Sequence, residues 1–263
     1  MYTILGGWIL AATVMAAVWL ISRWSRNAGV VDVAWGMGVA LISFLFAASA
    51  ADGNPARRIL VSILILLWAL RLSVYILRRV LTMPEDGRYE TLKEQWGDEA
   101  QRKLFWFFQL QAAACVLFAL PIWFACRNPE PLGLTDLLGT LIWVVSIAGE
   151  STADRQLAAF RNKPEHRGQV CQFGLWRYSR HPNYFFEWLH WWSYVLFSVG
   201  TEHGWITLLG PAAMFYFVTQ VTGIPPTEAQ ALRSRGDAYR RYQQSTNAFF
   251  PWWPRTQKVS DAA

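Results

Sequence analysis

Long apolar stretches alternate with short polar segments along the whole chain. Seven of these stretches are long enough for a helix that crosses the hydrocarbon core of a membrane, which takes about 20 residues. Irregular backbone is not tolerated against lipid, so each stretch is expected to be helical. The pattern predicts an all-α, multi-pass transmembrane bundle of about seven helices, over residues 3–22, 28–50, 59–78, 104–126, 133–153, 184–200 and 204–222.

The first apolar stretch is expected to remain in the protein as a membrane anchor. A secretory signal has a basic start, a shorter apolar region and a cleavage site made of small residues. Residues 1–22 contain no Lys or Arg, and their apolar run is longer than that of a signal. Cleavage as a signal is the alternative that this segment leaves open.

Composition and loop charge strengthen the membrane prediction. Charged residues make up 16% of the chain, against about 25% in soluble domains. Twenty of the 24 Lys and Arg residues fall in segments that the helix order places on one side. Only Arg57, Arg58 and Arg127 fall on the other side, and Arg71 lies inside a stretch. Because basic loops face the cytoplasm, the N-terminus is predicted outside and the C-terminus in the cytoplasm.

Several other classes of protein are not expected. The net charge of +6 and the pI near 9.4 largely follow from the loop bias, so no nucleic-acid partner is predicted. Cys115, Cys126 and Cys171 are not clustered, which predicts neither a disulfide framework nor a metal site. No obligate protein partner is evident, whereas membrane lipid is an expected one.

The third stretch and the segment after it carry one candidate group. Arg71 and Tyr75 recur at helical spacing and share a face. Arginines near a helix end can also simply extend to the headgroups, although Arg71 lies deeper than a helix end. A cytoplasmic loop then brings Asp86, Arg88 and Tyr89, which could bind an anionic or hydroxylated ligand. A solvated loop with a local Asp–Arg pair is the alternative.

Two further groups flank the fifth and sixth stretches. Glu150 and Asp154 share a helix face, and like charges at that spacing repel, so a ribose, an amide or an arginine is expected nearby, with Arg161 following. Pro182 suits the first position of a helix. Arg180 and His181 precede that helix start and could cradle a phosphate, and three polar residues, Asn183, Glu187 and His190, follow on one face.

An acid near the N-terminus and a polar tail complete the candidates. Asp32 is the one acid within the apolar stretches of the N-terminal half, followed by Gly36 and Gly38, which allow close helix approach. A carboxylate that stabilises a helix N-terminus is the alternative for Asp32. Residues 228–242 are predicted as an amphipathic cytoplasmic helix, which could lie on anionic lipid or close over the cytoplasmic opening.

These motifs resemble the steroid 5-alpha-reductase superfamily, and most closely its bacterial branch of multi-pass membrane proteins. The resemblance is firmest over residues 140–254. It rests on Tyr178-Ser-Arg180-His181-Pro182-Asn183-Tyr184, Glu187-Trp188, Tyr239-Arg-Arg-Tyr242 and Phe249-Phe250-Pro251-Trp252, with Glu85-Asp86-Gly-Arg88-Tyr89 and Asp32-Val-Ala-Trp35-Gly36 in the N-terminal half.

The resemblance implies an NADPH-dependent membrane reductase, similar to 3-oxo-5-alpha-steroid 4-dehydrogenase, with its active site facing the cytoplasm, here of a bacterial inner membrane. It implies reduction of a carbon–carbon double bond conjugated to a carbonyl in a sterol-like or isoprenoid-like substrate from the bilayer. It also implies one membrane domain over 1–263, with three helices and a cytoplasmic loop in 1–103, a reductase-like region in 104–254 and a polar tail in 255–263.

Site roles follow from the same resemblance. Glu187 would lie at the nicotinamide end, and Tyr75 and Asp32 are the nearest substitutes for the family's carbonyl-polarising residues, because Trp68 stands at the tyrosine's position. The expected cofactor-binding residues, those implied by the resemblance together with the candidates above, are Arg71, Asp86, Arg88, Tyr89, Asp154, Arg161, Tyr178, Arg180, His181, Asn183 and Tyr242.

Two other functions remain open from the sequence. Isoprenylcysteine carboxyl methyltransferases also carry an Arg-His-Pro stretch and a Tyr-rich tail, so an S-adenosylmethionine-dependent membrane methyltransferase is the alternative enzyme. That cofactor has no phosphates and would need fewer arginines than these loops provide. A lipid-binding or scaffold protein without catalysis is the third hypothesis, and it predicts dispersed polar residues.

Overall fold

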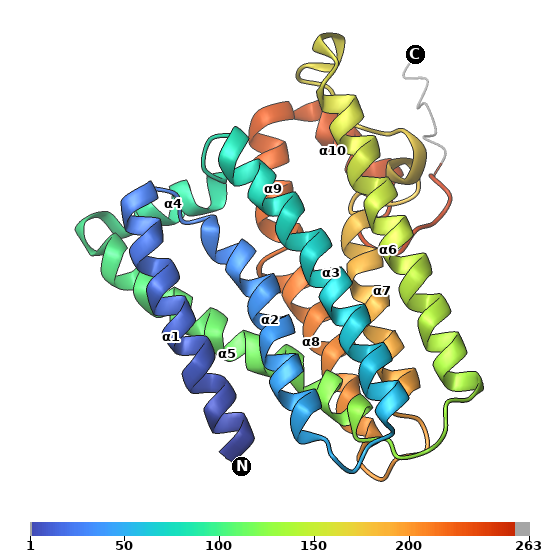
Figure 1. Cartoon of the computed structure of the whole chain (residues 1–263). Helices are drawn as coiled ribbons and strands as arrows, with labels where there is room; N and C mark the ends of the chain where they lie inside the picture. The colour runs from blue at the N-terminus through green and yellow to red at the C-terminus, as the bar shows by residue number, and fades with distance from the viewer. Residues whose placement is uncertain (1, 256–263) are drawn as a thin grey trace. The chain divides into compact units, whose positions relative to one another are not determined.

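The computed structural model describes residues 2–255, which are mainly helical and contain no strand. Six helical segments are long and apolar enough to cross a membrane, which is consistent with an integral multi-pass membrane protein (Figure 1). The helices are α1 (Tyr2–Ser25), α2 (Val30–Ser49), α3 (Pro55–Thr82), α4 (Gly87–Trp96), α5 (Ala100–Cys126), α6 (Leu134–Arg161), α7 (Pro182–Phe197), α8 (Leu209–Tyr216), α9 (Ile224–Arg235) and α10 (Asp237–Ser245).

The helix count and boundaries refine the sequence prediction. The predicted stretch 184–200 forms α7, which has 16 residues and begins at Pro182 as expected. It is shorter than the six membrane-length segments, so a count of seven spans stays a prediction. The stretch 204–222 is not one regular helix, because a 3-10 turn precedes α8 and a π-helical turn, Phe217–Val221, follows it.

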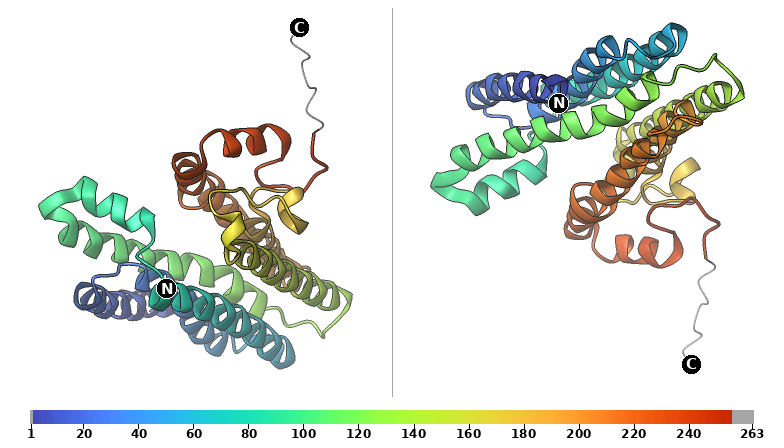
Figure 2. Two further views of the ribbon diagram at one scale, coloured as in Figure 1. Left: turned by 90° about the horizontal axis from the view of Figure 1, so that it is seen from above. Right: turned by 90° about the horizontal axis from the view of Figure 1, so that it is seen from below.

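The chain divides into two compact units. Unit 1 comprises residues 1–139 and 193–210. In it, α1, α2 and α3 form a layer, and α5 runs across one face of that layer (Figure 2). Two glycines of α2 permit this packing: a Cβ on Gly36 would lie 2.8 Å from the Ser73 hydroxyl, and one on Gly38 would lie 2.8 Å from the Cys115 sulfur.

A buried ion pair secures one end of unit 1. The Arg57 guanidinium donates to both carboxylate oxygens of Asp136, over 2.6 and 2.8 Å. It also donates to the backbone carbonyls of Asn128 and Glu130, over 2.9 and 2.7 Å. The side chains of the pair are 1% and 4% exposed. Arg57 therefore ties the start of α3 to the start of α6 instead of lying free in a loop.

Unit 2 comprises residues 140–192 and 211–263 and contains most of α6 and α7 together with α9 and α10. The predicted single helix over 228–242 is wrong, because α9 ends at Arg235 and α10 begins at Asp237. Gly236 between them has a φ of +50°, a left-handed conformation that glycine adopts without steric cost and that ends a helix.

Candidate functional site

Helices α6 and α7 meet along buried polar side chains. Ser146, Glu150 and Asp154 recur every four residues on α6, so they share one face, and all three are buried. The Asn183 side-chain amide on α7 donates to Asp154 over 3.3 Å. It is one of the hydrogen-bonding partners that the close spacing of Glu150 and Asp154 predicts.

The two helices approach closely at a glycine of α6. A Cβ on Gly149 would lie 2.4 to 2.6 Å from three ring carbons of Phe186 on α7. No L side chain larger than hydrogen fits there without displacing the ring. This contact holds the polar faces of α6 and α7 against each other.

The polar face of α7 continues along the helix from Asn183 to Glu187 and His190. The buried Glu187 carboxylate accepts a hydrogen bond from the Trp191 indole N–H over 3.3 Å. His190, with 0% of its surface exposed, has its Nδ1 2.7 Å from the backbone carbonyl of Glu187. A carbonyl can only accept, so Nδ1 carries a proton and donates it.

The side-chain oxygen of Asn183 is a buried acceptor at this contact. The Oδ1 atom of Asn183 is buried, and no donor within residues 2–255 lies within hydrogen-bond distance of it. If the amide were turned over, Oδ1 would face the Asp154 carboxylate, and two acceptors repel each other. The amide nitrogen therefore faces Asp154, and Oδ1 is the atom turned away from it. A buried polar atom without a partner is costly. This atom is suited to accept an N–H or O–H from a ligand.

Arg180 and His181, predicted to cradle a phosphate, instead contact an acid of α9. The Arg180 guanidinium donates to the Glu228 carboxylate over 2.6 Å and to the backbone carbonyls of Gln243 and Thr246. His181 Nε2 lies 3.2 Å from the same carboxylate. Burial lowers the pKa of His181 despite the contact with Glu228, so the imidazole is neutral at pH 7 and adds no charge for an anion.

Tyr242 also has a structural contact that the sequence did not predict. Its hydroxyl donates to the backbone carbonyls of Trp176 and Ser179, and burial raises its pKa above the ordinary tyrosine value. These bonds fasten α10 to the segment before α7. Tyr178 packs edge-on against Trp253, with ring centroids 5.2 Å apart, while Arg161 is exposed at the last turn of α6.

Unit 2 also contains a basic cavity that the sequence analysis did not single out. Its volume is about 550 Å³, and Arg177 and Arg241 both line it. The two arginines are far apart in the sequence, and only the fold of α10 onto the 171–177 segment brings them together. Among the remaining lining residues, Gln172, Ser245 and Thr246 supply amide and hydroxyl groups that can donate to an anion, and Pro254 lines the cavity without a donor.

The candidates of unit 1 form a separate hydrogen-bonded group. Arg88 bridges Asp86 and Asp32, each over 3.0 Å, and the Tyr89 hydroxyl donates to Asp32 over 2.8 Å. The predicted loop at these residues is wrong, because Asp86 caps the start of α4 and accepts from the Arg88 backbone N–H. The local Asp–Arg pair of the alternative interpretation is present, and Asp32 extends it to α2.

Arg71 and Tyr75 lie together on α3 in unit 1. The Arg71 guanidinium carbon is 5.7 Å from the centroid of the Tyr75 ring, a distance at which a cation is attracted to the ring face. Trp68, one turn earlier, is completely buried and packs edge-on against Trp35, with centroids 5.9 Å apart. Trp68 is therefore part of the core of unit 1.

Comparison with known proteins places this arrangement in a family. The model of the family described as "Protein of unknown function (DUF1295)" matches residues 18–246. The chain belongs to the DUF1295 family. It is also 25% identical to the uncharacterized protein C594.04c of Schizosaccharomyces pombe, over 93% of this chain and 78% of that protein. No solved structure matches the chain significantly.

The match spans both units of this DUF1295 protein, including the polar faces of α6 and α7 and the Asp32–Arg88 group. Helical spacing in the sequence was enough to find Asp154, Asn183 and Glu187. It could not find Arg241 or Glu228, whose partners are distant in the chain. The candidate site with a buried acceptor left open is thus the α6–α7 contact of unit 2.

Proposed function

We propose that this DUF1295 protein is an NADPH-dependent membrane reductase of a lipophilic substrate, sterol-like or isoprenoid-like, that carries a carbon–carbon double bond conjugated to a carbonyl. The observation that carries the proposal is the buried polar contact of Asp154 and Asn183, with an acceptor atom left without a partner. Ionisable groups buried in apolar helices are costly and mark functional sites by default.

The residues present suit the donors of a nicotinamide nucleotide. Ribose hydroxyls and the nicotinamide carboxamide both donate hydrogen bonds, and the Asn183 Oδ1 atom and the Asp154 carboxylate can accept them. Phosphates need positive charge, which Arg161, Arg177 and Arg241 supply in the same unit. A phosphate-free cofactor would not require this basic lining.

The chain's own groups would orient the reactants and manage charge. When bound, NADPH would supply a hydride for the carbon β to the carbonyl and leave as NADP⁺, and a proton, ultimately from water, would complete the reduction at the α carbon. Glu187, buried beside Trp191, is assigned to the nicotinamide end. Tyr75 and Asp32 are the candidate residues for the carbonyl oxygen. The Tyr75 hydroxyl can donate a preorganised hydrogen bond to it. The Asp32 carboxylate accepts from Arg88 and Tyr89 and would donate only when protonated.

The wider resemblance supports the same assignment. The Tyr178-Ser-Arg180-His181-Pro182-Asn183-Tyr184 motif and the Tyr239-Arg-Arg-Tyr242 motif resemble the steroid 5-alpha-reductase superfamily. We further propose seven spans in a bacterial inner membrane, with the nucleotide entering from the cytoplasm, because the basic residues gather in the segments expected on that side.

A panel of nucleotides tests the proposal. The purified protein in detergent is heated alone and with NADPH, NADH or S-adenosylmethionine, because a ligand that binds the folded state raises the melting temperature by mass action. NADPH is expected to raise it most, and the carbonyl-conjugated double bond of a model enone should then be reduced. Protection by S-adenosylmethionine alone would make the protein a methyltransferase, and protection by no nucleotide would contradict both enzymes.

A further inference from the structure

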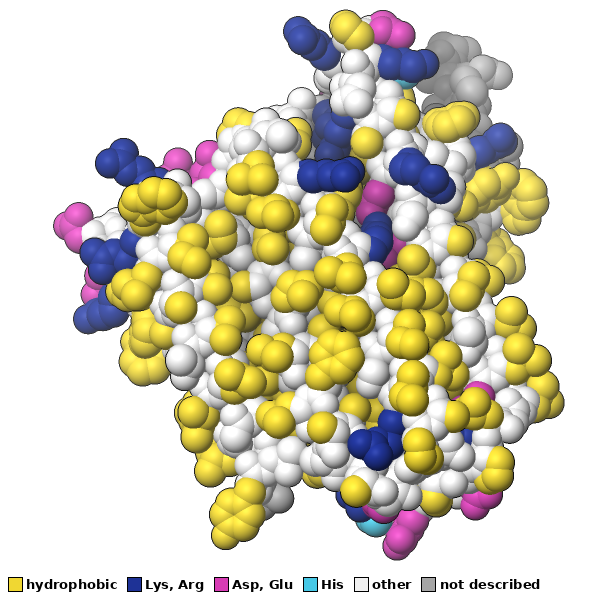
Figure 3. Space-filling model, in the orientation of Figure 1, with side chains coloured by type: hydrophobic (Ala, Val, Ile, Leu, Met, Phe, Trp, Pro, Cys, Tyr) yellow, Lys and Arg dark blue, Asp and Glu magenta, His cyan; other side chains and the backbone are white. Residues whose placement is uncertain are grey.

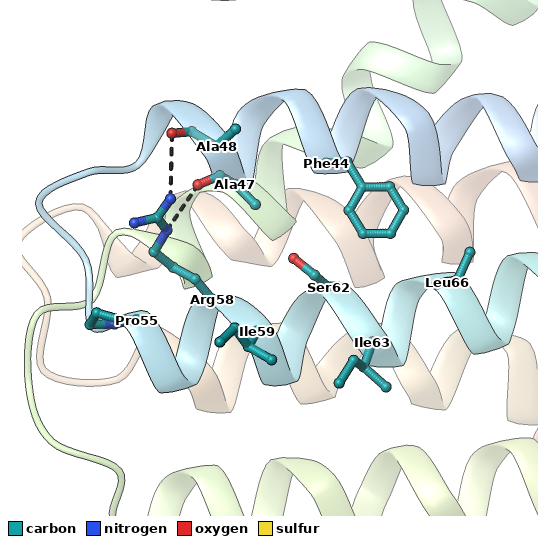
Figure 4. Close-up of a pocket in the computed structure, with 9 residues that line it drawn as sticks. All are labelled: Phe44, Ala47, Ala48, Pro55, Arg58, Ile59, Ser62, Ile63 and Leu66. Carbon is teal, nitrogen blue, oxygen red and sulfur yellow. Dashed lines mark hydrogen bonds between the residues drawn. The ribbon is translucent and has the colours of Figure 1, made fainter.

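A groove between α2 and α3 in unit 1 is lined by none of the candidate site residues (Figure 4). Its volume is about 430 Å³. Short side chains face one another across it, so the two helices leave space between them. The lining residues are Phe44, Ala47, Ala48, Pro55, Arg58, Ile59, Ser62, Ile63 and Leu66.

The groove opens on a surface suited to acyl chains. Ile59 and Ile63, at its side on α3, are 62% and 49% exposed, and Phe44 on α2 is 37% exposed. Both helices are long and apolar enough to cross a membrane. In the space-filling view, hydrophobic side chains cover the middle of α2 and α3, and basic side chains gather toward the helix ends (Figure 3).

An arginine stands at the end of the groove. Arg58 donates from Nε to the Ala47 carbonyl over 3.0 Å and from Nη2 to the Ala48 carbonyl over 3.4 Å. Figure 4 shows the guanidinium at these two carbonyls, with its remaining nitrogen directed away from them. The carbonyls end α2 and carry partial negative charge, which positions the guanidinium without neutralising it.

The neighbouring arginines differ because each is paired with an acid. Arg57 is paired with Asp136 at 2.6 Å, and Arg127 with Asp52 at 2.9 Å. Within residues 2–255, Arg58 forms no ion pair with an acid. Asp52, the nearby acid, is already held by Arg127, whose hydrogen bond lowers the pKa of that carboxyl. Among the three arginines of this end, Arg58 is therefore the one whose guanidinium is not ion-paired with an acid in residues 2–255.

We propose that the groove is a binding site for an anionic phospholipid. The phosphate accepts hydrogen bonds from the Arg58 guanidinium, and one acyl chain lies along the groove past Ser62 and Ile63. A basic group at the end of an apolar groove between membrane helices is the combination that recognises such headgroups. The proposal does not depend on the reductase function, because it uses no residue assigned to that site.

Lipid binding to the delipidated protein tests the site. Phosphatidylglycerol and phosphatidylcholine are added separately in detergent, and binding is followed by melting temperature and native mass spectrometry. Wild type is expected to prefer phosphatidylglycerol. Arg58→Gln should weaken that lipid about tenfold, the effect of losing a charge-assisted hydrogen bond. Arg58→Lys should retain part of the preference, and the matched control Arg127→Gln should behave as wild type.

A second variant and a soluble probe separate the headgroup from the chain. Ser62→Phe fills the groove and should weaken both lipids, while glycerol 3-phosphate alone should not raise the melting temperature. Equal binding of both lipids by wild type would overturn the proposal. So would a phosphatidylglycerol preference that survives in Arg58→Gln, unchanged binding in Ser62→Phe, or a glycerol 3-phosphate effect as large as that of the lipid.

Discussion

Two buried polar groups, one in each unit, differ in how completely they are satisfied. Around Arg57 and Asp136, the guanidinium contacts both carboxylate oxygens and several backbone carbonyls. At the Asp154–Asn183 contact, the Asn183 amide nitrogen donates to Asp154 over 3.3 Å, while the buried Asn183 Oδ1 atom has no hydrogen-bond partner within residues 2–255.

This difference separates architecture from a candidate site. Burying a charge is offset only when its hydrogen-bonding groups are used, and the first group meets that condition within unit 1. The second leaves an acceptor open inside an apolar helix pair, which is costly unless a ligand completes it. Both groups are therefore buried, and the unpartnered Asn183 Oδ1 atom is what distinguishes the candidate site from the Arg57–Asp136 pair.

Breaking the Arg57–Asp136 pair should give the largest loss of stability. Arg57→Met leaves the Asp136 carboxylate buried without its cation, which costs about 3–5 kcal/mol. The double variant Arg57→Met with Asp136→Leu should recover much of the loss, because no charge remains buried. Arg127→Gln, which breaks an exposed pair with Asp52, should cost less than about 1 kcal/mol. Denaturation in mixed detergent measures all three, and equal losses for Arg57→Met and Arg127→Gln would refute the distinction.

A substitution at the α6–α7 contact should have an intermediate effect. Gly149→Ala introduces a Cβ 2.4 Å from the Phe186 ring, and relieving that overlap costs about 1–3 kcal/mol. Gly6→Ala in α1 is the control, since nothing lies within 4 Å of the added Cβ, and it should be neutral or slightly stabilising. The melting temperatures of the two variants check this, and a Gly149→Ala protein as stable as Gly6→Ala would show that the two helices are not in close contact.

The sequence predicted where helices form better than it predicted which distant side chains pair with each other. The stretch 133–153 was cut where Glu150 and Asp154 lower the hydropathy, although α6 continues to Arg161. Arg57 and Asp136 are 79 positions apart, and no local pattern marks them as a pair. Spacing along one helix, by contrast, correctly placed Glu150 and Asp154 on a common buried face.

The residues at the start of α7 also show that a contact between distant segments cannot be predicted from local sequence. The helix start at Pro182 was predictable because proline suits the first turn. The role of Arg180 was not, because its acid, Glu228, comes from α9. The predicted polar tail 255–263 lies outside the described residues, apart from Arg255.

The smallest predicted effect concerns pH and the Asp86 group in unit 1. Burial would raise the pKa of Asp86, but Arg88 and Arg79 outweigh it and lower the pKa below the ordinary value. Asp86 therefore stabilises the fold above about pH 4, and this contribution is lost as the pH falls through its lowered pKa. Asp86→Asn keeps a good helix cap and should remove less than about 1 kcal/mol at pH 7.

Melting temperatures at pH 7 and at low pH check this prediction. The wild type should lose more stability on acidification than Asp86→Asn, whereas the exposed control Asp98→Asn should follow the wild type. If Asp86→Asn and the wild type lose stability in parallel, the Asp86 carboxylate is not held by its arginines.

The affinity of the purified protein for NADPH, compared between Asn183→Ala and the wild type, tests the open acceptor most directly. Removing the amide should weaken NADPH about tenfold or more, while the melting temperature without nucleotide changes little. Gln244→Ala, an exposed substitution on α10, should leave the affinity unchanged. Equal affinity for NADPH in the wild type and Asn183→Ala would contradict the assignment of the α6–α7 contact as the cofactor site.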